Sequence, residues 1–101
     1  MALETELDPE RSVLTLRIPE RFDFSLHRAF RDAYMRQSQS ARSYVIDLGE
    51  SAAIDSAALG MLLLLREHAG GERAEIHIVN GAPAIRELLC TAGFDRLFVL
   101  H

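Results

Sequence analysis

The sequence predicts an α/β fold with a largely parallel sheet, and three observations support this prediction. Patterns typical of strands and of helices alternate along most of the 101 residues. Residues 44–48 contain four apolar side chains in five, which is typical of a buried parallel strand. Two strand patterns stand next to each other at the start of the chain. We therefore expect βαβ units preceded by one antiparallel pair.

The expected strands cover residues 3–7, 13–18, 44–48, 74–79 and 97–100. The second strand alternates apolar and polar side chains up to Pro19, which indicates that it is half-buried. The first and weaker strand would pair with it as a hairpin through residues 8–10. The strand over residues 44–48 has little alternation, so we expect it to be buried on both faces.

The expected helices cover residues 25–37, residues 56–69 and a segment that Pro83 opens and Gly93 ends. Ser25 is the expected N-cap of the first helix, because its hydroxyl oxygen can accept an early backbone N–H. Residues 37–43 are polar and are expected to form the loop after that helix. In the third helix the predicted buried stripe is Ile85, Leu88, Leu89 and Ala92, and Cys90 is interpreted as a small buried residue.

The charge balance excludes some classes of partner. There are 15 acidic and 11 basic residues, which gives a formal net charge of −4. Such a surface repels phosphate backbones and anionic lipids, so neither a nucleic acid nor a membrane is an expected partner. The longest apolar run is far shorter than the ~20 residues of a membrane-spanning helix, and no signal-peptide pattern opens the chain. A single cysteine fits a reducing compartment. We expect one cytoplasmic domain over residues 1–101, as a monomer or weak dimer.

The most informative chemistry lies where the second helix begins. Asp55 is the expected N-cap, and Ile54 and Leu59 would pack together across it as a hydrophobic staple. Ser56 then stands at the first helical position without a capping role. A phosphoryl group there would add about −1.5 to −2 charges and would face the positive end of the helix dipole. The alternative is that Asp55 and Ser56 only cap the helix, where both residue types are common.

The segment over residues 45–65 resembles the motif of the STAS family, in its bacterial anti-sigma-factor antagonist branch. The resemblance centres on Ile54-Asp55-Ser56-Ala57-Ala58-Leu59-Gly60, and residues 19–23 and 93–98 are similar to flanking motifs of the family. It implies a STAS fold, with a mixed four- to five-stranded sheet and helices packed mainly on one side. Two residues depart from the family pattern, since Ala57 replaces a frequent second serine and Ala58 replaces a glycine.

The resemblance also implies a function. Ser56 is similar to a serine that an anti-sigma factor with serine kinase activity phosphorylates and a serine phosphatase restores. The unphosphorylated protein would bind its partner and the phosphorylated protein would release it. The alternative is a STAS subunit that scaffolds a transporter ATPase. The expected partner-binding residues are Asp23, Asp55, Ser56, Ala57, Leu59 and Met61.

The second helix has more apolar residues than one buried face can hold. One interpretation is that the surplus side chains, Met61 or Leu64, form a docking patch for a partner beside Ser56. The other is that neighbouring helices cover these side chains, and both interpretations stay open. No nucleophile, base and oxyanion donor converge in the sequence, so we expect a binding module and not an enzyme. The four histidines and Cys90 lack metal-ligand spacing, and no metal or cofactor is expected.

Overall fold

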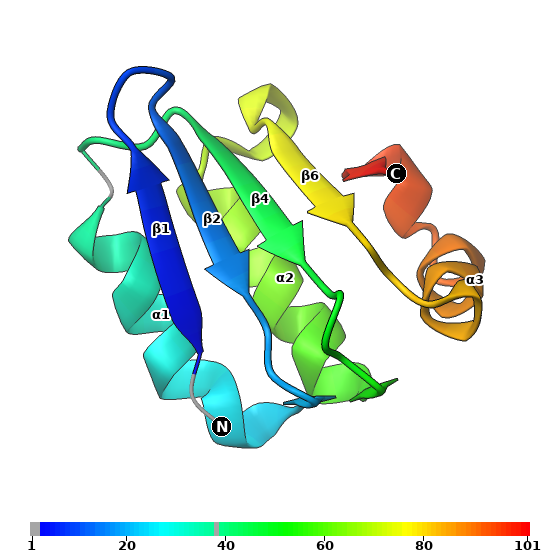
Figure 1. Ribbon diagram of the computed structural model, residues 1–101. Helices are drawn as coiled ribbons and strands as arrows, with labels where there is room; N and C mark the ends of the chain where they lie inside the picture. Colours follow the sequence, from blue (N-terminus) through cyan, green and yellow to red (C-terminus); the bar gives the residue numbers. More distant parts are fainter. Residues whose placement is uncertain (1–2, 38) are drawn as a thin grey trace.

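The computed structural model describes residues 3–37 and 39–101 and contains a five-stranded sheet, a two-stranded sheet and three α-helices (Figure 1). The large sheet has the order β1-β2-β4-β6-β7, from β1 (Glu4–Asp8), β2 (Val13–Arg17), β4 (Ser43–Asp47), β6 (Ile76–Val79) and β7 (Val99–Leu100). The small sheet pairs β3 (Arg21–Phe22) with β5 (Ala53–Ile54). The helices are α1 (His27–Arg36), α2 (Ser56–His68) and α3 (Pro83–Thr91).

The strand pairing confirms the predicted mixed sheet. β1 and β2 are antiparallel, with Leu7 opposite Leu14. The other neighbours are all parallel, and Leu16, Ile46 and Ile78 stand in one row across β2, β4 and β6. Because each parallel crossover passes through a helix, the chain follows the βαβ pattern that the sequence predicts.

Both α1 and α2 cover the same face of the sheet, where they lie side by side (Figure 1). Leu16 and Ile46 point to this face and are fully buried, as are Leu62 and Leu65 of α2. On the opposite face, side chains such as Val45 remain half-exposed. The expectation that residues 44–48 are buried on both faces is therefore wrong, because no helix covers the second face of β4 in the part of the chain that the structure describes.

The first helix begins differently from the prediction. Asp23, and not Ser25, accepts the first backbone N–H, and a 3-10 turn, η1 (Phe24–Leu26), precedes α1. Ser25 donates its own hydroxyl to Asp23. The carboxylate is the stronger acceptor, so the cap moves two residues towards the N-terminus. The predicted loop over residues 37–43 includes Ser38, which lies outside the described residues.

Pro83 and Gly93 mark the two ends of α3 as predicted, and Gly93 has a left-handed φ of 82°. Ile85 and Leu89 of the predicted stripe are buried. Leu88 is 41% exposed, however, and Ala92 and Cys90 are exposed as well. The predictions for these three residues were wrong. α3 is a short helix at the β6–β7 edge of the sheet (Figure 1), and it buries only Ile85 and Leu89.

The small β3–β5 sheet was not predicted. Each strand has only two residues, which is too short for an apolar period to be visible in the sequence. Within residues 3–37 and 39–101, no helix is long and apolar enough to cross a bilayer.

Candidate functional site

Ser56 is the first residue of α2, and the residue before it caps the helix. The backbone of Asp55 is extended (φ −121°, ψ −178°), and its Oδ1 accepts the N–H of Ala58 at 2.9 Å. Ser56 is exposed and has no capping role. The Asp55 cap and the position of Ser56 match the sequence prediction, and Ile54 and Leu59 are partly buried against the core.

The small sheet brings the two candidate aspartates together. β3 and β5 run parallel, with Phe22 opposite Ile54. Asp23 and Asp55 directly follow these two residues, so both aspartates lie at the same end of the small sheet. Hydrogen bonds from the hydroxyl and the backbone N–H of Ser25 hold the pKa of Asp23 below its usual value. Asp23 thus caps η1, and Asp55 caps α2 and directly precedes Ser56.

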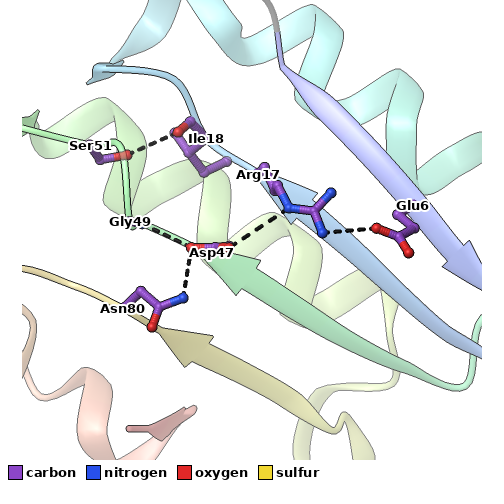
Figure 2. Close-up of polar contacts among 7 residues, drawn as sticks. All are labelled: Glu6, Arg17, Ile18, Asp47, Gly49, Ser51 and Asn80. Atoms are coloured by element: carbon purple, nitrogen blue, oxygen red, sulfur yellow. Dashed lines mark hydrogen bonds and ion pairs between the residues drawn. The ribbon is translucent and has the colours of Figure 1, made fainter.

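Polar contacts anchor the loop that leads to Ser56 (Figure 2). Ser51 is 5% exposed and donates its hydroxyl to the carbonyl of Pro19 at 2.9 Å. Asp47 accepts the backbone N–H of Gly49 at 2.9 Å and the side-chain amide of Asn80 at 3.1 Å. These bonds tie the loop to the segment after β2 and to the ends of β4 and β6. Ser51 is thus a structural residue, whereas Ser56 is open to other proteins.

An apolar groove lies between α2 and α3, and Ser56 is one of the residues that line it. Its volume is about 590 Å³. It is lined by Ile54, Asp55, Ser56, Leu59, Ala84, Glu87, Leu88, Thr91 and Ala92. Leu88, whose exposure the sequence did not predict, is one of the apolar side chains that line it. The exposed Ser56 hydroxyl therefore belongs to a surface that can bind an apolar segment.

The structure separates the predicted partner-binding residues into two groups. Asp55, Ser56 and Leu59 line the groove. Asp23 follows β3, which pairs with β5, the strand directly before Asp55. Ala57 is half-buried beside Ser56. Met61, in contrast, is only 7% exposed and belongs to the core, so its assignment to a docking surface was wrong. It shares the core-facing side of α2 with Leu62 and Leu65.

The surplus of apolar residues on α2 is only partly covered. Leu64 is 63% exposed and Leu63 is 40% exposed. Of the two residues named from the sequence, Leu64 is therefore exposed and Met61 is buried.

Phe24 is an exposed apolar residue that the sequence did not reveal. It is 62% exposed and stacks on the ring of His27, with 4.1 Å between the ring centroids. In a continued strand, Phe24 would share the buried side of Phe22. The 3-10 turn that starts at Asp23 rotates it outwards instead, and no sequence period announces such a turn.

A family model for STAS domains, described as "Mlab, STAS domain", matches residues 5–100. The chain belongs to the STAS family. A STAS-domain-containing protein of Pseudomonas aeruginosa is 47% identical over 98 residues, which cover 97% of each chain.

Solved structures show how widely this STAS fold is shared. A putative anti-sigma factor antagonist of Thermotoga maritima matches with a TM-score of 0.80 at 14% identity, over 97% of this chain and 84% of that one. SpoIIAA, an anti-sigma factor antagonist of Bacillus, matches in its unphosphorylated form with a TM-score of 0.73 at 14% identity, over 94% and 96% of the two chains. Its phosphorylated form matches with a TM-score of 0.70 at 13% identity, over 99% and 91%. The fold expected from the sequence is confirmed.

Proposed function

We propose that this STAS domain is an anti-sigma-factor antagonist that works by partner switching. With Ser56 unphosphorylated it binds an anti-sigma factor with kinase activity, or a related regulator, and with Ser56 phosphorylated it releases that partner. A serine phosphatase resets the switch. The observation that carries the proposal is the exposed Ser56 hydroxyl at the start of α2, beside an apolar groove and next to a cap that Asp55 supplies.

The fold supports a switch that changes the surface and leaves the core alone. A phosphoryl group on Ser56 would meet water and the positive end of the α2 dipole, an interaction that favours an anion by roughly 0.3–1 kcal/mol. The fully buried Ala58 and Leu62 lie on the other side of the helix. SpoIIAA, which shares this fold, has been solved in both an unphosphorylated and a phosphorylated form.

Release follows from the difference between the free and the bound environment. In the complex the phosphoryl group would lose water against a surface that fits a hydroxyl, close to the like charges of Asp55 and Asp23. A net penalty of about 2.8 kcal/mol lowers the affinity about a hundredfold. That change is sufficient to release a partner bound with micromolar affinity.

The test is titration calorimetry of the purified regulator against four forms of the protein. We expect wild type and Ser56→Ala to bind alike, Ser56→Asp to bind more weakly, and protein phosphorylated at Ser56 to bind about a hundredfold more weakly. Mass spectrometry should find the phosphoryl group on Ser56 and not on the buried Ser51. Equal affinities for the phosphorylated and unphosphorylated forms would reject the switch and favour the transporter ATPase scaffold.

A further inference from the structure

Two histidines that are far apart in the sequence meet on the face of the large sheet opposite to α1 and α2. His77 lies in β6, where it pairs with Val45 of β4 and with Val99 of β7. His101 directly follows β7, and its backbone N–H donates to the carbonyl of Ile78 at 3.0 Å. This bond holds His101 beside β6, and Nδ1 of His77 lies 2.7 Å from Nε2 of His101. The two residues are 24 positions apart, so their spacing in the sequence gave no sign of a joint site.

The tautomer of His77 follows from its second polar neighbour. Its Nε2 lies 3.4 Å from Oε2 of Glu75. An ionised carboxylate can only accept hydrogen bonds, so Nε2 of His77 carries the proton and donates to Glu75. In a neutral imidazole the other nitrogen then has a free lone pair. Nδ1 of His77 therefore presents a lone pair to the space that it shares with His101.

This arrangement is the one in which histidines bind metal ions. A ligating histidine usually donates its other ring N–H to a carboxylate or a carbonyl, which fixes the orientation of the ring and raises its basicity. Glu75 has this position relative to His77. Two metal–nitrogen bonds of about 2.0–2.1 Å at a tetrahedral angle place the two nitrogens roughly 3.3 Å apart. A small rotation of the exposed His101 ring is sufficient to reach that separation.

The site is open to solvent on its remaining sides. The His77 side chain is 29% exposed, and Val99 beside it is 46% exposed. Among residues 3–37 and 39–101, no group of three or more His, Cys, Asp or Glu side chains is placed to hold a metal ion. The pair therefore supplies two ligands, and water would complete the coordination shell. Imidazole nitrogen suits zinc, nickel and copper, whereas magnesium and calcium take oxygen ligands.

We propose that His77 and His101 bind one divalent transition-metal ion of the zinc, nickel and copper class, through Nδ1 of His77 and Nε2 of His101. Without metal, His101 donates its Nε2–H to the Nδ1 lone pair of His77. With metal, His101 takes the tautomer that has its proton on Nδ1, so both rings stay neutral. Glu75 is a positioning residue that holds the His77 ring. The metal ion would clamp the two-residue β7 to β6, independently of the proposed switch at Ser56.

Isothermal titration calorimetry of the full chain with zinc chloride and with nickel chloride tests the site. The protein carries no histidine purification tag, which would itself bind these metals. The variants are His77→Gln, His101→Gln and Glu75→Ala. The matched control is His27→Gln, because His27 is an exposed histidine whose ring stacks on Phe24 and has no histidine beside it among the described contacts. Melting temperatures without metal show that each variant folds.

We expect one zinc or nickel ion to bind per chain, with equal affinity in wild type and His27→Gln. Glu75→Ala should lower the affinity about tenfold without changing the metal-free melting temperature, and losing either ligand histidine should lower it further. Zinc at about ten times its dissociation constant should raise the melting temperature of wild type by roughly 5–10 °C, and neither ligand variant should show this shift. Unchanged zinc affinity in His77→Gln and His101→Gln would overturn the proposal. So would a wild-type melting temperature that zinc does not raise.

Discussion

Replacing Asp55 with alanine should destabilise the fold, whereas replacing the adjacent Ser56 should not. Asp55 Oδ1 accepts the N–H of Ala58 at 2.9 Å, and Ala58 is fully buried. An N-cap is worth about 0.5–2 kcal/mol. We expect Asp55→Ala to fall in the upper half of this range, because water replaces the lost acceptor poorly at a buried residue. For a domain of this size, each kcal/mol lowers the melting temperature by about 4–8 °C.

Thermal and urea unfolding measure the effect, and Asp55→Ser is the matched control. Serine can keep the cap but removes the charge. We expect Asp55→Ser to fold with nearly wild-type stability and to bind the regulator more weakly, which separates the capping role from the recognition role. Ser56→Ala should leave the free energy of unfolding within about 0.5 kcal/mol of wild type. The reasoning is refuted if Asp55→Ala melts like wild type, or if Ser56→Ala loses as much stability as Asp55→Ala.

Three further predictions follow from the site and the core. Asp23→Ala should lower regulator affinity on the order of tenfold in calorimetry, because it removes a carboxylate at the same end of the small sheet as Asp55. A fall in melting temperature with unchanged affinity would make its role structural. Leu62→Ala should lower the free energy of unfolding by about 2–5 kcal/mol in urea titrations, since Leu62 is fully buried in α2. Burial raises the pKa of the Tyr34 and Tyr44 hydroxyls above 10, so the stability they support should be complete below pH 10 and lost as the pH rises through the folded-state values. Tyr34→Phe should flatten that alkaline decline in urea midpoints.

Local and periodic features could be predicted from the sequence. The alternation over residues 13–18 and the apolar run at 44–48 predicted strands, and both form within one residue of the expected bounds. The Asp55 cap was visible because a cap depends on neighbours within three residues of the chain. Pro83 and Gly93 marked the ends of α3 for the same reason. The central motif then identified the family and pointed to Ser56.

Which of these residues meet, and which of them reach the surface, depends on how the elements pack together. Asp23 and Asp55 lie side by side because the two-residue strands before them pair, a contact between segments about 30 residues apart in the sequence. Met61 and Leu64 are both apolar residues of one helix, yet one enters the core and the other is exposed. The composition of a helix does not reveal its rotation against the sheet, since rotation is set by packing with α1 and the strands. Burial therefore depends on partners that are distant in the chain, and no local pattern in the sequence contains them.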